Sequence, residues 1–174
     1  MPTHRAAIAL GSNLGDSCQI LKSALETLDR RSGIRVEAVS AAYQTVAIGP
    51  PQPDYLNACA VLSTDLQPLA LLNALLEVEA QFGRVRRERW GARLLDLDLL
   101  LFENWVMEQP GLQIPHPRMV ERAFVLIPLA EVAADWVEPL SGKAIAFLVQ
   151  QVDCSGVQKI PPLLCPLVEN PPNS

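Results

Sequence analysis

Apolar residues recur along the chain with two different periods, and these periods predict the order of its elements. A run over residues 5–10 predicts a short buried strand, which ends at a glycine-bearing turn. Apolar positions at 20–28 then recur every three to four residues, which predicts a helix capped by Asp16 or Ser17. Two further strands are predicted over 34–48 and 55–66, paired antiparallel across a proline-rich connection.

The pattern of a helix followed by a strand then returns. A helix is predicted from Pro68 to Phe82, with leucines on its inner face and Gly83 just past its end. Residues 94–102 alternate around two aspartates, which predicts another strand. The order β-α-β-β-α-β indicates an α+β fold with a ferredoxin-like core. Two added C-terminal helices are expected near 124–136 and 141–151.

The chain length of 174 residues suits one domain. We expect residues 1–160 to form it. Five prolines lie between residues 161 and 174, which predicts a C-terminal tail without regular structure.

Composition narrows the classes of protein that this chain can be. Hydrophobic residues make up 49% and charged residues 19%, which excludes general disorder. The net charge of -5 argues against a surface built for nucleic acid. No apolar run approaches the ~18 residues of a membrane span, and the first run is too short for a signal peptide. We therefore expect neither a nucleic acid nor a membrane as partner.

The four cysteines are Cys18, Cys59, Cys154 and Cys165. None forms a CxxC pair, and none has a histidine at metal-ligand spacing. This pattern favours free thiols in a reducing compartment over a disulfide framework or a zinc site. We expect a cytoplasmic protein.

Two aspartates in the last predicted strand are the first candidates for chemistry. Asp96 and Asp98 lie two residues apart, so their side chains share one face of a strand, with Cα atoms ~6.6 Å apart. Such a pair can bind one hard cation, or two Mg²⁺ ions ~3.5–4 Å apart. The alternative is an ordinary amphipathic strand with a wet face.

A cluster of arginines leads directly into this strand. It consists of Arg84, Arg86, Arg87, Arg89 and Arg93. Arginine binds phosphate through two parallel hydrogen bonds, whereas lysine acts as a point charge. Alone, the cluster also fits a solvated loop or a nucleic-acid patch. Next to paired carboxylates it favours a polyphosphate–metal site of the kind that transfers phosphoryl groups.

Other polar and aromatic residues suit a planar ligand. Trp90 lies within the arginine cluster and can stack on such a ligand or pack on a neighbouring helix. Tyr55 and Asn57 share a strand face, and an asparagine amide offers the donor and acceptor that a heterocycle edge needs. A purely structural role for Asn57 is equally open. His116 stands between two prolines, where ligand contact and helix capping are both open.

These residues together resemble the 6-hydroxymethyl-7,8-dihydropterin pyrophosphokinase family of folate biosynthesis. The most specific segment is RWGARLLDLDLL at 89–100. Similar segments are GSNLG at 11–15, PDYLN at 53–57, GRVR at 83–86 and PHPRM at 115–119, followed by Arg122 and Phe124. The resemblance implies a monomeric, ferredoxin-like enzyme. It would transfer pyrophosphate from ATP to the pterin's hydroxymethyl oxygen and release AMP.

The resemblance also implies a role for each matching position. Asp96 and Asp98 would hold two Mg²⁺ ions, and Arg84 and Arg93 would contact the transferring phosphates. The residues implied for ATP are Glu79, Arg86, Arg89, Trp90, Leu99, His116 and Arg122. The residues implied for the pterin are Gly11, Thr45, Ile48, Tyr55, Asn57, Trp90 and Phe124.

Three positions depart from the family's pattern. Ala92 stands where a proline is usual, Val46 follows Thr45 where a proline is common, and Leu76 replaces a glutamine found in some members.

Three alternatives stay open: an RNA-binding module on a similar sheet, a different two-metal nucleotidyl enzyme, and a homologue without activity.

Overall fold

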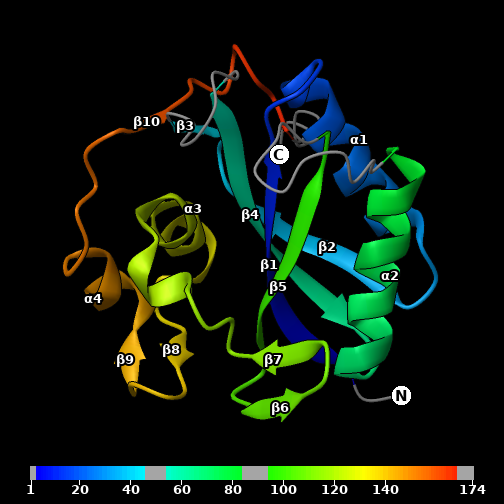
Figure 1. Cartoon of the computed structure of the whole chain (residues 1–174), viewed down its shortest axis with the longest axis vertical. Coiled ribbons are helices and arrows are strands. Elements are labelled where there is room, and N and C mark those ends of the chain that lie inside the picture. Colours follow the sequence, from blue (N-terminus) through cyan, green and yellow to red (C-terminus); the bar gives the residue numbers. More distant parts are fainter. Residues whose placement is uncertain (1–2, 46–53, 84–93, 168–174) are drawn as a thin grey trace, which may run out of the picture.

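The computed structural model describes residues 3–45, 54–83 and 94–167. Its main sheet consists of β1 (His4–Ser12), β2 (Ile34–Val39), β3 (Tyr43–Thr45), β4 (Tyr55–Thr64), β5 (Asp96–Phe102) and β10 (Val157–Lys159). The helices within the described ranges are α1 (Ser17–Arg30), α2 (Pro68–Gln81), α3 (Ala123–Ala133) and α4 (Ile145–Val149), with a 3-10 turn η1 (Met119–Glu121) before α3. The strand order is β10-β3-β4-β1-β5, with β2 also pairing with β4, and every pair is antiparallel (Figure 1).

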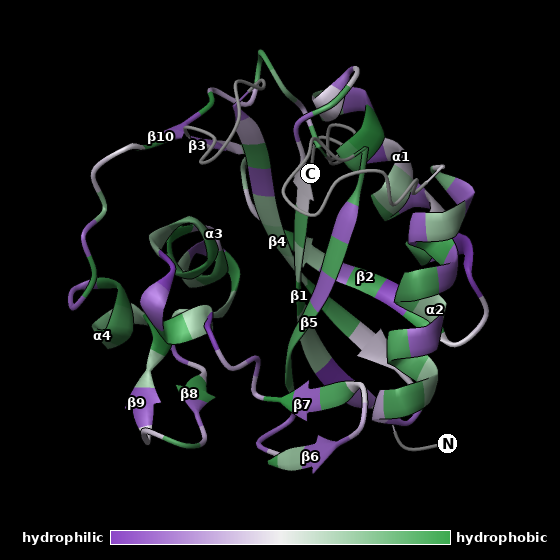
Figure 2. Ribbon diagram, viewed as in Figure 1, coloured by the Kyte–Doolittle hydropathy of each residue, from purple (hydrophilic) through white to green (hydrophobic). Residues whose placement is uncertain are grey.

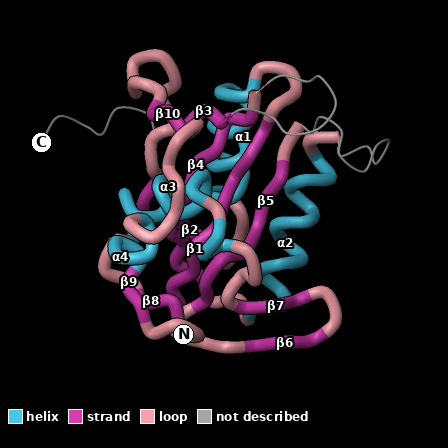
Figure 3. The backbone as a smooth tube through the Cα atoms, turned by 60° about the vertical axis from the view of Figure 1, so that its left-hand side comes forward, coloured by secondary structure: helices cyan, strands magenta, loops and turns pink. Residues whose placement is uncertain are grey.

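The sheet separates two helical layers (Figure 1, Figure 3). The helices α1 and α2 cover one face, and α3 and α4 lie on the other. Strand alternation builds both cores, because neighbouring residues of one strand point to opposite faces. Ile8 of β1 packs with the α1 and α2 side, whereas its neighbour Ala7 packs with Leu126 of α3. The fold is therefore a mixed α/β structure in three layers around an antiparallel sheet.

The elements with the clearest periods are confirmed. The buried positions of α1 are Leu21, Ala24, Leu25 and Leu28, spaced as the sequence predicts. Asp16 caps this helix, and its Oδ1 accepts a hydrogen bond from the backbone N–H of Gln19 at 3.2 Å. The strands predicted over 5–10, 55–66 and 94–102 are β1, β4 and β5.

The single strand predicted over 34–48 is wrong, because the structure has two strands there, β2 and β3. Ser40 interrupts the ladder. Its backbone N–H donates to the carbonyl of Cys59, its hydroxyl accepts from the N–H of Cys59, and the same hydroxyl lies 2.8 Å from the carbonyl of Ala41. A serine side chain that replaces ladder hydrogen bonds turns the chain without any glycine or proline. Residues 46–53 lie outside the described residues.

The C-terminal half holds short elements that periodicity does not predict. The strands β6 (Met107–Gln109) and β7 (Leu112–Ile114) form a hairpin directly after β5, and β8 (Val137–Glu138) pairs with β9 (Lys143–Ala144). The helix expected near 124–136 is α3. The helix expected over 141–151 is shortened to α4, because residues 143–144 belong to β9.

The prediction of four free thiols is wrong. Cys18 and Cys165 form a disulfide across 147 positions of sequence, with Cα atoms 5.7 Å apart, whereas Cys59 and Cys154 are free. The C-terminal segment, residues 161–167, returns to α1 in three dimensions (Figure 1). Cys165 and Leu167 are both buried in the core beside that helix. Cysteine spacing in the sequence indicates only local pairs, so it does not predict a disulfide between residues this far apart.

Residues 161–167 contain turns but neither helix nor strand, as their prolines predict. Their carbonyl at Pro161 accepts hydrogen bonds from the N–H groups of Leu164 and Cys165. The domain boundary at residue 160 stays a prediction. None of the helices in the described ranges is long and apolar enough to cross a membrane.

Candidate active site

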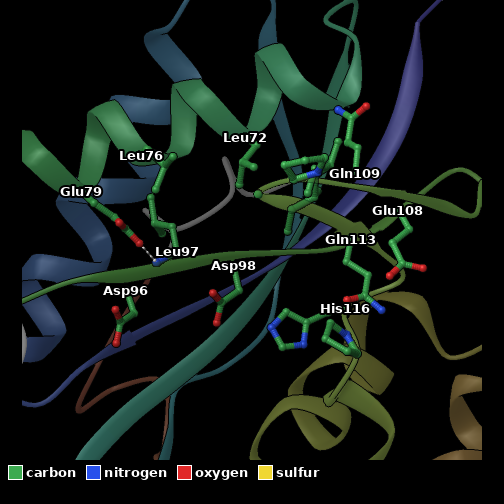
Figure 4. Close-up of a pocket in the computed structure, with 15 residues that line it drawn as sticks. Leu72, Leu76, Glu79, Asp96, Leu97, Asp98, Glu108, Gln109, Gln113 and His116 are labelled. Carbon is green, nitrogen blue, oxygen red and sulfur yellow. Dashed lines mark hydrogen bonds between the residues drawn. The ribbon is translucent and has the colours of Figure 1, made fainter. Parts of the chain in front are cut away.

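A cavity of about 760 Å³ opens along the outer edge of β5, the last strand of the described sheet (Figure 4). It lies between α2 and the β6–β7 hairpin. Its walls are Leu72, Leu76 and Glu79 of α2, residues 96–99 of β5, residues 108–113 of the hairpin, and His116 with Pro117. This volume is within the range of small-molecule sites.

The alternation of β5 separates its polar residues from its apolar ones. Leu97 and Leu99 are buried in the core beneath α1 and α2, whereas Asp96 and Asp98 lie on the other face. Figure 4 shows both carboxylates on the same side of the strand. Figure 2 shows the hydrophilic residues near the start of β5 and an apolar stretch after them. The predicted shared face is therefore confirmed.

The donor set of this carboxylate pair suits Mg²⁺ better than a metal that needs a protein cage. No group of three or more histidine, cysteine or acidic residues with metal-binding geometry occurs within the described ranges. Mg²⁺ is commonly held by one or two carboxylates, with waters and substrate phosphates completing its shell. Asp96 and Asp98 can supply that number of protein ligands.

A buried carboxylate fixes the edge of β5. Glu79 of α2 is only 3% exposed, and its Oε1 accepts a hydrogen bond from the backbone N–H of Leu97 at 2.7 Å. In an antiparallel strand every second residue directs its backbone N–H and C=O away from the partner strand. Leu99, two residues beyond Leu97, therefore directs its own N–H and C=O toward the cavity side.

His116 is held against the same edge. Its backbone N–H donates to the carbonyl of Leu100 at 2.9 Å, and its Nδ1 accepts from the N–H of Arg118 at 3.2 Å. That second bond leaves the ring proton of a neutral imidazole on Nε2. Burial lowers the pKa of His116, and the charges of Arg122 and Arg118 lower it further against the opposing effect of Asp98. The lowered pKa favours the neutral ring, in which Nε2–H can donate a hydrogen bond.

A row of residues crosses the sheet beside the carboxylates. Asp96 of β5 stands opposite Gly11 of β1, Gly11 opposite Asn57 of β4, and Asn57 opposite Tyr43 of β3. A Cβ atom at Gly11 would lie 3.2 Å from Oδ1 of Asn57, so a larger residue there would push this amide out of place by a few tenths of an ångström. The Nδ2 of Asn57 donates to Oγ1 of Thr45 at 2.9 Å. This hydrogen bond holds the Asn57 amide and the Thr45 hydroxyl in place, the two groups that a planar ligand would meet.

Further predicted residues lie at the margins of this row. Tyr55 stands opposite Thr45 in the β3–β4 pair. Phe124 is the second residue of α3, the helix that packs on β4, and the guanidinium of Arg122 lies 5.7 Å from its ring centroid. The predicted residues that lie outside the described residues are Ile48, Arg84, Arg86, Arg89, Trp90 and Arg93.

The sequence patterns missed the outer wall of the cavity. Glu108, Gln109 and Gln113 line it from the β6–β7 hairpin. The available signal is the Pro110–Gly111 pair between them, which is typical of a tight turn. Gly111 indeed has a positive φ of 80°.

Comparison with known proteins gives the same family as the motifs. The family model described as 7,8-dihydro-6-hydroxymethylpterin-pyrophosphokinase (HPPK) matches residues 7–134. A Synechocystis protein named 2-amino-4-hydroxy-6-hydroxymethyldihydropteridine pyrophosphokinase is 49% identical over 159 residues, which cover 91% of this chain and 82% of the relative. A Methylorubrum extorquens protein of the same name is 42% identical over 157 residues, covering 90% and 98%.

Solved structures share the fold at much lower identity. A Plasmodium falciparum HPPK-DHPS chain with SDX-DHP superposes with a TM-score of 0.71 at 15% identity, covering 86% of this chain and 45% of that one. The wild-type form of that protein gives a TM-score of 0.69. This chain thus spans less than half of those Plasmodium chains. The family match over residues 7–134 confirms the resemblance that the motifs indicated, and the chain belongs to the 7,8-dihydro-6-hydroxymethylpterin-pyrophosphokinase family.

Proposed function

We propose that this protein transfers the pyrophosphoryl group of ATP to the hydroxymethyl oxygen of 6-hydroxymethyl-7,8-dihydropterin, in folate biosynthesis. The alcohol oxygen attacks the β-phosphorus, the bond from that phosphorus to the α–β bridging oxygen breaks, and AMP leaves while the hydroxyl proton passes to solvent. The observation that carries the proposal is the carboxylate pair of Asp96 and Asp98 beside a nucleotide-sized cavity, in a chain of this family.

Asp96 and Asp98 would hold two Mg²⁺ ions. Their oxygen donors suit this cation, and the lack of a larger ligand cluster among the described residues leaves room for phosphate oxygens in its shell. When bound, Mg²⁺ supplies positive charge that offsets the charge of the triphosphate. The protein's own contribution is then to hold the two substrates in line, which is mostly orientation and electrostatics.

ATP would bind in the cavity at the edge of β5. The outward N–H and C=O of Leu99 offer a donor and an acceptor to the base, and Glu79 keeps this edge straight through Leu97. The neutral Nε2–H of His116 and the guanidinium of Arg122 suit the ribose and phosphates. The motif positions Arg84, Arg86, Arg89, Trp90 and Arg93 would complete this side, with Arg84 and Arg93 on the transferring phosphates.

The pterin would bind along the row on the neighbouring strands. Asn57 and the backbone of Gly11 would meet its edge, with Thr45, Tyr55 and Phe124 around it. Ile48 and Trp90 would close the pocket by the family resemblance. Adjacent strands are ~4.8 Å apart, so the backbones of Asp96 and Asn57 are ~10 Å apart across β1. Two substrates bound at these places would lie side by side, with the reacting groups near Asp96.

We also propose a ferredoxin-like core for residues 4–102. Its support is the antiparallel order of β2 and β3, then β4, β1 and β5, with α1 and α2 on one face. A monomer in the cytoplasm is proposed as well. The proposed location rests on ATP as the substrate. The cysteines no longer support it, because Cys18 and Cys165 form a disulfide and are not free thiols.

A product assay tests the reaction. The purified protein is incubated with MgATP and 6-hydroxymethyl-7,8-dihydropterin, and the nucleotides are resolved by chromatography. We expect AMP only when the pterin and Mg²⁺ are both present. Release of pyrophosphate from ATP would identify a different nucleotidyl enzyme. Salt-dependent RNA binding without Mg²⁺, in the absence of AMP formation, would favour the RNA-binding alternative.

A further inference from the structure

A carboxylate outside the reacting groups joins four separate parts of the fold. Glu131 of α3 accepts a hydrogen bond from the hydroxyl of Tyr43 in β3. Its other oxygen, Oε2, accepts from the backbone N–H of Ala41 at 3.0 Å, in the connection between β2 and β3. Lys159 of β10 lies 3.7 Å from Oε1. The Glu131 side chain therefore holds the start of β3 and also contacts β10, the strand on the outer side of β3.

The Tyr43 hydroxyl is a dependable donor in this arrangement. The tyrosine is only 6% exposed. Burial raises its pKa above the usual range, and the hydrogen bond to Glu131 raises it further. The proton therefore stays on Tyr43 at any pH at which the enzyme would work, and the link to α3 stays formed.

The strand that is fixed in this way orders the amide at the proposed pterin site. β3 has only three residues, and two of them, Tyr43 and Thr45, stand opposite Asn57 and Tyr55. Thr45 accepts the hydrogen bond from Nδ2 of Asn57. A displacement of β3 would therefore rotate the Asn57 amide or leave its N–H without this partner.

Glu131 also supports Phe124, on the α3 side of the proposed pterin site. Phe124 and Glu131 are seven residues apart in α3, two helical turns, so they lie on one side of the helix. Pro128 lies between them and has no N–H to donate to the carbonyl of Phe124. The first turn of α3 thus has weaker support from its own helix. The contacts of Glu131 with β3 supply support from outside.

We infer that Glu131 is a positioning residue for the pterin: through Tyr43 and Ala41 it fixes β3 against α3, so that Thr45, Asn57 and Phe124 form one preorganised pocket. This inference rests on the proposed function of the site. It makes Glu131 and Tyr43 act on the affinity for the pterin, while ATP binds at the far edge of β5, two strands away from β4.

The test compares the wild-type protein with Tyr43→Phe, Glu131→Gln and the double variant. Binding is measured by titration calorimetry with the pterin in the presence of Mg²⁺ and an ATP analogue whose α–β bridge is a methylene group, which blocks transfer. We expect each single change to weaken pterin binding about tenfold. Tyr43→Phe removes the hydrogen bond from the tyrosine, and Glu131→Gln leaves one uncharged acceptor oxygen for the two donors, Tyr43 and Ala41. The affinity for the analogue alone should change less than about twofold. The double variant should lose less affinity than the sum of the two single effects in free energy, because both changes act on the Tyr43–Glu131 hydrogen bond.

Two controls separate position from charge and from stability. Asp135→Asn neutralises an exposed carboxylate just beyond α3 and should bind the pterin like the wild type. Lys159→Met removes the ion pair but keeps both hydrogen bonds, so its effect should stay within about threefold. Unfolding by urea should find every variant folded at the assay temperature.

The outcomes distinguish the inference from the proposed function. If the wild type makes AMP but both single variants bind the pterin normally, the inference is overturned and the proposed function stands. Equal loss of pterin and nucleotide affinity, or a loss in Lys159→Met as large as in Glu131→Gln, would also overturn it. A wild type that binds no pterin would overturn both.

Discussion

Single polar residues along the edge of β5 each have a separate task. Glu79 is turned inward and holds the backbone of Leu97, whereas Asp96 and Asp98 are turned toward the open face. No buried side-chain nitrogen or oxygen within the described ranges lacks a hydrogen-bond partner. Buried polar groups therefore stabilise the edge, whereas Asp96 and Asp98 line the cavity beside it.

Neutralising Asp96, which is half-buried, or Asp98, which is exposed, tests the metal assignment. Asp96→Asn and Asp98→Asn keep side-chain size but remove the charge, so we expect turnover to fall by about 10²–10³-fold or more. Stability should change little, because neither side chain is buried in a core cluster. AMP formation is followed as a function of Mg²⁺ concentration, with Asp135→Asn as control. A variant with near-normal turnover would contradict the assignment of that aspartate as a metal ligand.

Glu79 offers a different kind of test, because it acts through the backbone. Glu79→Ala leaves the N–H of Leu97 without this acceptor in a buried place, which costs about 1–3 kcal/mol of unfolding free energy. The loosened edge should also raise the KM for ATP more than that for the pterin. Glu79→Gln retains an acceptor oxygen and should recover much of the lost stability. Urea unfolding and steady-state kinetics measure the two effects. Equal increases in both KM values would show that Glu79 supports the whole site and not this edge alone.

At the scale of elements, the parts predicted from sequence are those with enough residues to show a period. The helices α1 and α2 and the strands β1, β4 and β5 span 7 to 14 residues each. The strand over 34–48 was predicted wrongly, because Ser40 ends it through side-chain hydrogen bonds that leave no mark on the hydropathy pattern. β6 and β7 have three residues each, too few for alternation to be visible.

The same reasoning separates the predictable from the unpredictable parts of the site. Asp96 and Asp98 are two residues apart on one strand, so their shared face follows from local geometry alone. The cavity beside them is formed by α2 and the β6–β7 hairpin, segments about 30 residues apart in sequence. The link from Glu131 to Tyr43 spans 88 positions. Such contacts depend on the packed fold and are not encoded in any local pattern.

The interface of β3, β4 and α3 predicts a dependence of stability on alkaline pH. Burial raises the pKa of Cys59, and the charge of Asp98 raises it further; burial likewise raises that of Tyr43. A raised pKa favours the protonated form in the folded state. The contribution of each group to the free energy of unfolding is fully present below its ordinary pKa, about 9 for the thiol and about 10 for the phenol. It is lost as the pH rises above that value.

Urea midpoints between pH 7 and pH 11 measure this dependence, over incubation times that keep the disulfide intact. Cys59→Ala should remove the part of the decline that begins near pH 9, and Tyr43→Phe the part above about pH 10. The absolute stability of each variant will also be lower, so the comparison concerns the slope with pH. Slopes parallel to the wild type in both variants would contradict the assignment.

At the scale of the whole molecule, the C-terminal segment closes the fold. After β10, the N–H of Ile160 donates to the carbonyl of Ala42, and residues 161–167 then run from this side of the sheet to α1. Cys165 and Leu167 are buried there, and the disulfide to Cys18 holds the segment in place. The segment thereby connects the sheet edge formed by β10 and β3 with helix α1.

The disulfide should contribute measurable stability, because it joins residues 147 positions apart and so restricts the unfolded chain. Cys18→Ala and Cys165→Ala should each lower the free energy of unfolding by about 2–4 kcal/mol under oxidising conditions. The wild type should lose a similar amount on reduction, whereas the two variants should be insensitive to reductant. Cys154→Ala, which removes an exposed free thiol, is the matched control and should behave like the wild type. Thiol titration of the denatured wild type should find two reactive thiols before reduction and four after it, and four thiols before reduction would show that the bond does not form.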